Sequence, residues 1–335
     1  MPFDPTAPAA FAQLTPQAVL DALDRVGVRG DGRVLQLNSY ENRVFQVMLD
    51  DGQAVVAKFY RPGRWSDAQI LEEHAFALEL AQAEVPVVPP LKLDGATLVH
   101  CEIDGEPHRF SVSERRAGRS PELEDEATLH WLGRFIGRLH AVGSRQPFVH
   151  RRRLDPTTVG QAAIDTLLTQ DHVPPMQRPA WEQTARQALT IVEQAFEQAS
   201  GCQAFRLHGD CHPGNLLWRE PDGPHFVDLD DACTGPAVQD LWMLLAGDRE
   251  AAQRQLRALL AGYEMFRPFD DRELALIEPL RTLRMLHHSA WIAQRWHDPA
   301  FPAAFPWFGS GAYWEQQTTQ LREQLQRMDA SADGE

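Results

Sequence analysis

Residues 207–218 read LHGDCHPGNLLW, and residues 226–232 read FVDLDDA. The glycines and the proline predict that the first segment is a loop. Asp210 can accept a proton from an attacking hydroxyl, and the Asn215 amide oxygen can ligate a hard cation such as Mg²⁺. The second segment reads as a strand end on which Asp228 and Asp230 alternate and therefore point to one side. Together the two segments predict a hard-metal site beside a candidate general base.

The part of the chain before this loop has the character of a sheet with one main helix. Runs of β-branched and aromatic residues predict strands at 33–38, 43–49 and 54–60, with two shorter strands at 97–101 and 108–113. Asp50-Asp51-Gly52 predicts a hairpin turn, because glycine accepts a positive φ. The apolar pattern from Ser66 to Ala83 predicts a helix, with Ser66 and Gln69 as a capping box. Residues 1–17, rich in proline and alanine, are expected to be an irregular lead-in.

A polar, turn-rich segment at 114–126 is expected to be a hinge or linker. Beyond it the sequence predicts helices at about 125–143, 157–169, 178–200, 237–246, 249–265, 270–296 and 313–328. The expected fold is therefore α+β and bilobal. Residues 1–115 would form a small β-rich N-terminal lobe that binds nucleotide, and residues 116–335 a larger helical lobe with the catalytic and substrate residues. The cleft between the lobes is the expected site.

The composition is that of a globular protein, with 43% hydrophobic and 24% charged residues. The net charge of −15 argues against a general nucleic-acid binder, which needs basic surface. No stretch approaches the roughly 20 apolar residues of a membrane span, and the first residues do not resemble a signal peptide. The four cysteines fit neither a disulfide framework nor a zinc site, so a cytoplasmic protein with free thiols is expected.

Lysine is rare in this chain: of its 32 basic residues, two are lysines, Lys58 and Lys92. Lys58 lies inside the apolar run AVVAKFY (54–60), which marks it as a candidate functional ammonium. A solvated lysine at a strand edge is the alternative interpretation.

The order H-G-D-x-x-x-x-N, then D-x-D, resembles the catalytic and metal loops of the protein-kinase-like superfamily. More narrowly, it resembles the aminoglycoside phosphotransferase and choline kinase branch. Further segments carry a closer likeness: LNSYENRVFQV (37–47), VVAKFYRPGRWS (55–66), QILEEHAFALEL (69–80), GPAVQDLWMLL (235–245) and DPAFPAAFPWF (298–308). On these motifs the chain is identified as a member of the bacterial stress response kinase A (RdoA/YihE-like) family, from about residue 34 to 320.

The resemblance implies a cytoplasmic serine/threonine protein kinase that uses ATP and Mg²⁺ and has a bilobal fold. It implies that Asp210 is the catalytic aspartate and that Asn215 and Asp228 hold Mg²⁺, with Asp228 counted among the catalytic groups as well. It leaves open whether Asp230 or Asp231 helps a second metal ion.

For the nucleotide, the resemblance implies that the Lys58 ammonium contacts phosphates and is fixed by a carboxylate of the following helix. Spacing favours Glu73 over Glu72 for this partner. The equivalent of the glycine-rich loop of protein kinases is here residues 38–42, without glycine. Ser39 is expected to donate its hydroxyl to a phosphate, although an ordinary hairpin turn is the alternative.

Several features admit two interpretations. His208, Cys211 and His212 could form a zinc site, although His208 is expected rather to pack and hold the loop. Asp240 is either an N-cap or an anchor for the backbone of the catalytic loop. Residues 151–153, three arginines, are expected to be a solvated face that could also dock an acidic partner. The aromatic residues between Trp291 and Trp314 are either core or a wall of the substrate cleft.

Three functions remain open from the residues. The first is a protein kinase acting on serine or threonine, and the second is a small-molecule kinase of the aminoglycoside, choline or homoserine type. The third is a non-catalytic nucleotide-binding scaffold, which the retention of all the catalytic residue types disfavours. A monomer is expected, with a protein substrate and ATP as partners and neither nucleic acid nor membrane.

Overall fold

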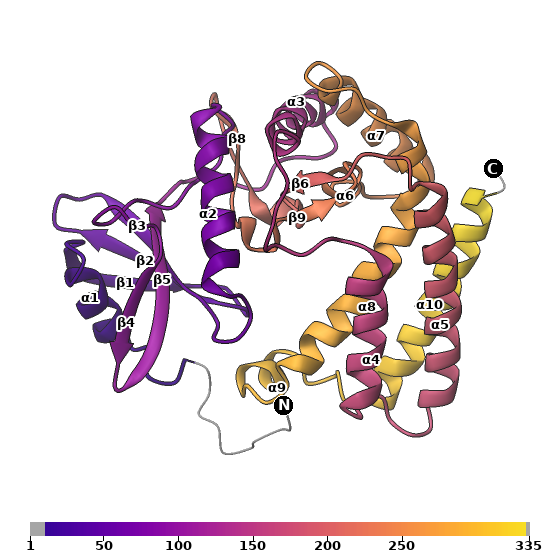
Figure 1. Cartoon of the computed structure of the whole chain (residues 1–335), viewed down its shortest axis with the longest axis horizontal. Helices are drawn as coiled ribbons and strands as arrows, with labels where there is room; N and C mark the ends of the chain where they lie inside the picture. Colours follow the sequence, from indigo (N-terminus) through magenta and orange to yellow (C-terminus); the bar gives the residue numbers. More distant parts are fainter. Residues whose placement is uncertain (1–10, 333–335) are drawn as a thin grey trace.

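The computed structural model describes residues 11–332. Its N-terminal part is a five-stranded antiparallel sheet in the order β1-β2-β3-β5-β4, and the rest is mostly helical (Figure 1). The elements of the first part are α1 (Pro16–Asp24), β1 (Gly30–Leu37), β2 (Arg43–Leu49), β3 (Ala54–Phe59), α2 (Asp67–Gln82), β4 (Val99–Ile103) and β5 (Glu106–Glu114). The predicted α+β fold, with a small β-rich part before a larger helical part, is confirmed.

The central strand β3 shows why the sheet can carry a functional lysine. Val55, Ala57 and Phe59 are buried on the face that packs against α1. Because side chains alternate along a strand, Val56 and Lys58 point to the opposite face. Lys58 pairs in register with Val44 of β2 and Ser111 of β5, so its side chain rises from the middle of the sheet.

Helix α2 links the sheet to the helical part (Figure 1). Its predicted capping box is present: the Ser66 hydroxyl accepts the Gln69 backbone N–H, and the Gln69 side chain accepts the Ser66 N–H. Phe76 and Leu80 are fully buried in an apolar cluster that also contains residues of α3 and α7. Residues 1–10 of the expected lead-in lie outside the described residues, whereas α1, capped by Thr15, was not predicted.

The second part contains α3 (Glu126–Gly143), a π-helical turn η1 (Pro156–Gln161), α4 (Ala162–Thr169), α5 (Arg178–Gln198), β6 (Phe205–Leu207), the 3₁₀ turn η2 (Pro213–Asn215), β7 (Leu216–Arg219), β8 (Gly223–Phe226), the 3₁₀ turn η3 (Leu229–Asp231), β9 (Cys233–Gly235), α6 (Gln239–Trp242), α7 (Arg249–Tyr263), the 3₁₀ turn η4 (Asp271–Leu276), α8 (Ile277–Gln294), α9 (Ala300–Ala304) and α10 (Gly311–Ala332). A helix stands at each of the seven predicted places, whereas α9 was not predicted. Within residues 11–332, no helix is long and apolar enough to cross a membrane.

The expected hinge, residues 114–126, connects β5 to α3. It is fixed at its middle, because Arg119 and Trp218 of β7 exchange two backbone hydrogen bonds of 3.0 and 2.7 Å. The end of α2 shares its apolar cluster with the helical part. A domain boundary at residue 115 therefore stays a prediction.

Helices α3 and α7 approach each other closely because glycines line their contact. A Cβ added to Gly133 of α3 would lie 2.0 Å from the Leu259 carbonyl oxygen, and one added to Gly262 of α7 would lie 2.0 Å from the His130 carbonyl oxygen. The obstacle in both cases is backbone, which cannot rotate away. The two helices therefore pack at a distance that only glycine permits.

We expect Gly133→Ala to lower the free energy of unfolding by about 1–3 kcal/mol, since the added methyl forces the two helices apart. Chemical unfolding followed by circular dichroism measures the change. Gly309→Ala is the matched control, because nothing lies within 4 Å of its Cβ position. Equal stabilities of the two variants would contradict the close packing of α3 on α7.

Candidate active site

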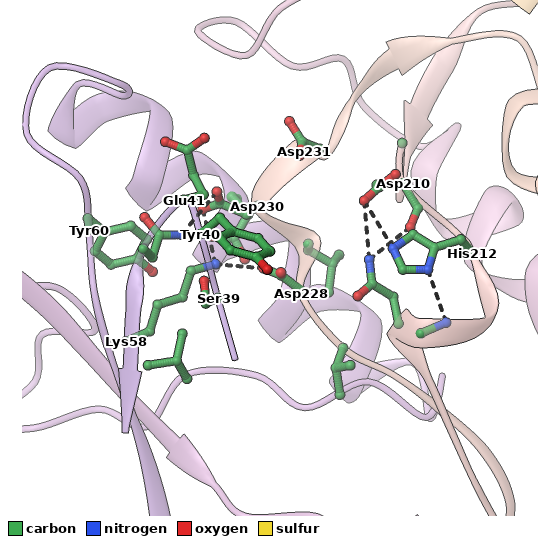
Figure 2. A pocket seen from close by; sticks show the side chains of 18 of the residues that line it. Ser39, Tyr40, Glu41, Lys58, Tyr60, Asp210, His212, Asp228, Asp230 and Asp231 are labelled. Carbon is green, nitrogen blue, oxygen red and sulfur yellow. Dashed lines mark hydrogen bonds and ion pairs between the residues drawn. The ribbon is translucent and has the colours of Figure 1, made fainter. Parts of the chain in front are cut away.

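A cavity of ≈ 920 Å³ lies between the sheet and the helical part. The sheet contributes the side chains beside Lys58, and α8 contributes one of its faces. The cavity also contains the loop of residues 38–42, the loop around Asp210 and the segment 227–231. Figure 2 shows Lys58 and Asp210 on either side of Asp228. The residues that the sequence predicted for the site, Ser39, Lys58, Glu73, Asp210, Asn215 and Asp228, all line this one cavity.

Lys58 is held between two carboxylates. Its Nζ lies 2.8 Å from Asp228 Oδ1 and 3.0 Å from Asp230 Oδ1, and 17% of its side chain is exposed. Burial by itself would lower the pKa of Lys58, but the two aspartates outweigh it and raise that pKa well above its usual value. The ammonium therefore stays charged, and the alternative of a solvated strand-edge lysine is wrong.

The expected partner of Lys58 on α2 is not an ion-pair partner in this structure. No hydrogen bond or ion pair joins the described side chains of Lys58 and Glu73. Burial raises the pKa of Glu73 to about 7, and the Lys58 charge opposes that rise. Glu72, the other candidate, instead accepts the backbone N–H groups of residues 149–151. Lys58 extends across the cavity to the segment 227–231, and the carboxylates that hold its ammonium therefore come from that segment.

The segment 227–231 is a turn and not a strand end. Strand β8 ends at Phe226, Asp228 adopts a left-handed backbone with φ 58°, and residues 229–231 form η3. The strand alternation that was expected to place Asp228 and Asp230 on one side is therefore absent, so the stated reason was wrong. Both nevertheless reach Lys58, because the left-handed residue reverses the chain between them. An aspartate tolerates this conformation better than most residues.

The loop around Asp210 is fixed by a buried anchor. The Asp240 carboxylate accepts the backbone N–H groups of His208 and Gly209, each at 2.8 Å, and lies 3.0 Å from His140 Nε2. Asp240 is not the N-cap of α6, so the anchor interpretation is confirmed. His208 is fully buried, with its Nε2 2.9 Å from the Val227 carbonyl, and holds the loop as expected.

Asp210 and Asn215 lie side by side in this loop. Asn215 Nδ2 donates to the Asp210 backbone carbonyl at 2.9 Å and lies 3.4 Å from its Oδ2. Burial raises the pKa of Asp210, but the hydrogen bond with His212 and the charge of Arg284 outweigh it, so the pKa lies below its usual value. Asp210 is therefore ionised at neutral pH, as a proton acceptor must be.

The residues present fit a Mg²⁺ ion. The Asn215 amide nitrogen is used by Asp210, so its oxygen remains as a ligand, and the Asp228 side chain is 53% exposed in the cavity. Mg²⁺ commonly takes one or two protein oxygens and completes its shell with phosphate oxygens and water. Among the described residues no group of three or more His, Cys, Asp and Glu side chains could hold a metal ion. The zinc alternative therefore fails, because His208, Cys211 and His212 do not form such a group.

The loop of residues 38–42 is held by charge instead of by glycine. Arg61 donates to the backbone carbonyls of Tyr40 and Glu41, at 3.0 and 2.8 Å. The Glu41 carboxylate lies 2.7 Å from Arg295 Nη2 and accepts the Trp291 indole N–H at 2.5 Å. These contacts tie the loop, and with it Ser39, to α8 of the helical part.

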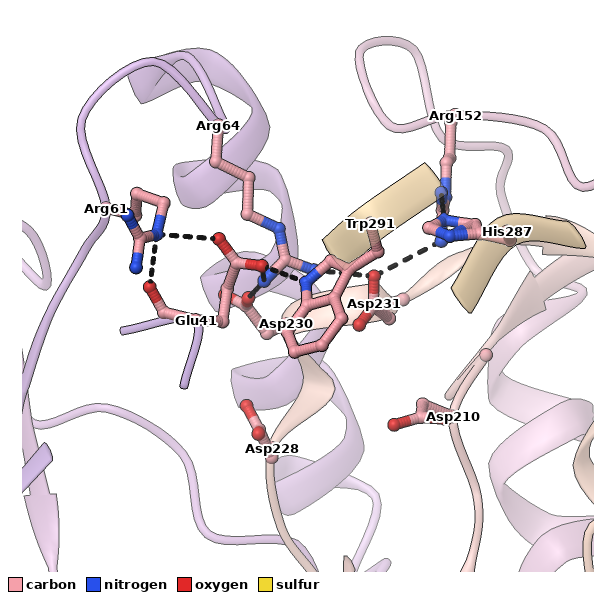
Figure 3. A network of polar contacts seen from close by, with 12 residues as sticks. Glu41, Arg61, Arg64, Arg152, Asp210, Asp228, Asp230, Asp231, His287 and Trp291 are labelled. Atoms are coloured by element: carbon pink, nitrogen blue, oxygen red, sulfur yellow. Dashed lines mark hydrogen bonds and ion pairs between the residues drawn. The ribbon is translucent and has the colours of Figure 1, made fainter. Parts of the chain in front are cut away.

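Arg64 and Arg284 are among the arginines of the site that the sequence did not predict. Arg64 bridges the 227–231 segment, at 2.6 Å from Asp230 Oδ2 and 2.8 Å from Asp231 Oδ1, and Figure 3 shows it between Glu41 and Asp231. It occupies both carboxylates that a second metal would need. Arg284 of α8 donates from Nη1 to Asp210 Oδ1 at 2.6 Å. Arg64 could have been found from its place in the segment 55–66, which carries the family likeness. No feature of the neighbouring sequence distinguishes Arg284 from the other arginines of its helix.

Of the arginines at 151–153, Arg153 is exposed as expected, whereas the expectation of a solvated face was wrong for Arg151 and Arg152. Arg151 is buried, donates to the backbone carbonyls of Ala232 and Asp230, and lies over the Trp65 ring. Arg152 lines the cavity and pairs with Asp231 at 3.2 Å. Both hold the segment that carries Asp228 in the cavity between the sheet and the helical part.

The C-terminal aromatic residues divide between the two interpretations. Trp291 and Phe305 line the cavity, at 5.8 Å between ring centroids. Phe308 and Trp314 are fully buried in the core formed by α4, α5, α8 and α10. Trp307 is 41% exposed and does not line the cavity.

The profile of the phosphotransferase enzyme family matches residues 33–277. Stress response kinase A of Escherichia coli (strain K12) is 42% identical over 321 residues, which cover 94% of this chain and 93% of that protein. The serine/threonine protein kinase RdoA of Salmonella typhimurium (strain LT2) is also 42% identical, with the same coverage of 94% and 93%.

Solved structures show the same fold. The amicoumacin kinase hAmiN, in complex with AMP-PNP, Ca²⁺ and Ami, has a TM-score of 0.72 and 18% identity, covering 95% of each chain. A microcompartment-associated aminopropanol kinase has a TM-score of 0.72 and 18% identity, covering 94% of this chain and 98% of its own.

Proposed function

Because the chain belongs to the phosphotransferase enzyme family and is a kinase, we propose that it transfers the γ-phosphoryl group of ATP to serine or threonine hydroxyls of proteins, with Mg²⁺ as cofactor. The observation that carries the proposal is the 2.8 Å contact between Lys58 of the sheet and Asp228 of the helical part. It lies in the cavity that also contains Asp210 and Asn215. The 42% identity to a relative named as a serine/threonine protein kinase favours a protein acceptor, and the shared name stress response kinase A favours a role in a bacterial stress response.

On this proposal the two sides of the cavity have separate tasks. The Lys58 ammonium binds phosphate oxygens, and the Ser39 hydroxyl is a further donor from the loop above. Asn215 Oδ1 and the Asp228 carboxylate would hold Mg²⁺. When bound, that ion supplies positive charge against the phosphate oxygens.

The acceptor approaches from the side of Asp210. The Asp210 carboxylate orients the serine or threonine hydroxyl and takes its proton. The hydroxyl oxygen forms the new bond to the γ-phosphorus, and the bond from that phosphorus to the β,γ-bridging oxygen breaks. The products are a phosphoserine or phosphothreonine, ADP and one proton on Asp210.

Transfer from γ-labelled ATP tests the proposal. The acceptors are the protein itself, a generic protein substrate and a panel of small amino alcohols and sugars, each with and without Mg²⁺. Metal-dependent label on protein serine or threonine is expected. Label confined to small molecules would overturn the protein acceptor, and an absence of transfer to every acceptor despite ATP binding would favour the scaffold alternative.

We expect Lys58→Arg to raise the Kd for ATP by roughly tenfold, about 1.4 kcal/mol. The ammonium sits 2.8 and 3.0 Å from two different carboxylates, a space that the larger planar guanidinium cannot enter in the same way. Calorimetric titration with ATP measures the change. Lys92→Arg is the matched control, because Lys92 is exposed and does not line the cavity. Unchanged ATP affinity in Lys58→Arg would remove Lys58 from the phosphate-binding role.

A further inference from the structure

One face of α8 forms the wall of the cavity next to Asp210. The residues of this face recur at helical spacing: Leu280, Leu283, Arg284, His287, His288 and Trp291. An acceptor hydroxyl held at Asp210 therefore lies next to this helix. Its side chains can therefore contact the groups of the acceptor that lie beside the hydroxyl.

Arg284 is the cation of this face. Its side chain is 48% exposed, and its Nη1 donates to Asp210 Oδ1 and lies 3.9 Å from Met243 Sδ. Within residues 11–332 no group accepts a hydrogen bond from its Nε or Nη2. These two nitrogens form the edge of a guanidinium that binds a carboxylate or phosphate through two parallel hydrogen bonds.

The cavity offers little to a cationic acceptor, by contrast. Six of its seven carboxylates are paired with arginine or lysine: Glu41, Glu114, Asp210, Asp228, Asp230 and Asp231. The seventh, Glu73, is buried on α2 in the sheet half of the cavity. An ammonium arriving beside Asp210 would have to break one of these pairs.

The aromatic wall is also occupied by the chain itself. The His288 ring stacks on Trp291 with 5.9 Å between the ring centroids. The Arg295 guanidinium lies 5.5 Å from the centre of the same indole. An aromatic cage for an amine presents free ring faces to it. Trp291 does not have that freedom, so cation–π binding does not compensate for the missing carboxylates.

We propose that Arg284 selects protein acceptors that carry an anionic side chain, a carboxylate or a phosphate, beside the serine or threonine that is phosphorylated. This inference rests on the proposed function, since it names the substrate class of the same site. Arg284 would keep or exchange its contact with Asp210 while its Nε–Nη2 edge binds the anion. It is then a specificity-determining residue, and Arg152, which donates to His287 Nε2 at 2.9 Å, adds positive charge nearby.

The test compares three peptides that differ only in the residues beside one serine: glutamate, glutamine or lysine. For the unaltered protein, kcat/KM should be roughly tenfold higher for the glutamate than for the glutamine peptide, a factor that one charge-assisted hydrogen bond supports. Arg284→Gln should remove this ratio and Arg284→Glu should reverse the preference toward lysine. Arg281→Gln is the matched control, because Arg281 is on the same helix but pairs with Glu278 outside the cavity.

The ratio between peptides is the decisive readout, since any damage to Asp210 lowers all three rates together. Peptides with alanine in place of the serine report binding without turnover and should give the same order of affinity. Equal affinities and rates for the glutamate and lysine peptides would overturn the role of Arg284 and leave the protein kinase standing. Transfer only to glycerate, an anionic small alcohol, would overturn the protein acceptor on which both proposals depend. Transfer only to amino alcohols would overturn the protein acceptor and the preference for an anion.

Discussion

Asp210→Asn should lower the rate of phosphoryl transfer by about 10²–10⁴-fold, the contribution of a positioned general base, while the affinity for ATP changes little. The substitution keeps the shape of the side chain and leaves one oxygen that can accept the hydrogen bond from Arg284. What it removes is the negative charge that takes the hydroxyl proton. Because that proton moves only during the transfer step, the loss should appear in kcat more than in nucleotide binding.

The measurement is steady-state transfer from labelled ATP, together with calorimetric titration of ATP and Mg²⁺. Asp165→Asn is the control, an exposed aspartate on α4 that accepts a hydrogen bond from Gln161 and does not line the cavity. Turnover of Asp210→Asn equal to that of this control would remove Asp210 from catalysis. A loss of ATP affinity as large as the loss of rate would move its role from proton transfer to ground-state binding.

The second large effect is expected from Asp228→Asn. This variant should lose the Mg²⁺-dependent part of its ATP affinity, roughly tenfold or more and at least about 1.4 kcal/mol, together with most of its activity. A neutral amide is a weaker ligand for Mg²⁺ than a carboxylate. Asparagine is chosen because Asp228 has a φ of 58°, which asparagine also adopts without the cost that alanine would bring.

Asp228 also pairs with Lys58, so the metal role has to be separated from the ion pair. Titrations of ATP with and without Mg²⁺ make that separation. In the absence of metal, Asp228→Asn should bind ATP at least as well as the unaltered protein, because Lys58 has lost one competing carboxylate. The same enhancement of affinity by Mg²⁺ in both proteins would exclude Asp228 as a metal ligand.

Local signals in the sequence predicted most of the fold. The capping box at Ser66 and Gln69 and the hairpin at residues 50–52 are set by interactions between near neighbours in the chain. The long helices follow from apolar residues at helical spacing. Helices α1 and α9 were not predicted, because they are short and contain proline within or beside the helical residues.

The site residues that lie in sequence motifs were predicted. Those that reach the site only through tertiary packing were missed. Lys58, Asp210, Asn215 and Asp228 lie in motifs, and the fold brings them into one cavity. Arg284 is one arginine on a long helix, and only the packing of α8 beside residue 210 gives it a role. Spacing in the sequence could not exclude Glu73 as the partner of Lys58, because burial decides its charge and depends on the folded surroundings.

The placement of Lys58 between Asp228 and Asp230 has a consequence for covalent chemistry at the site. Of the two lysines in the chain, Lys92 is exposed, while the Lys58 amine is kept protonated by its two carboxylates. A protonated amine is not nucleophilic, so acylating reagents would modify Lys92 first and leave the cavity untouched. A reagent delivered to the cavity by a nucleotide group would meet one lysine there. The high local concentration would let the small unprotonated fraction of that lysine react. Because the chain has two lysines, the extent of this acylation would measure the share of molecules whose cavity admits a nucleotide.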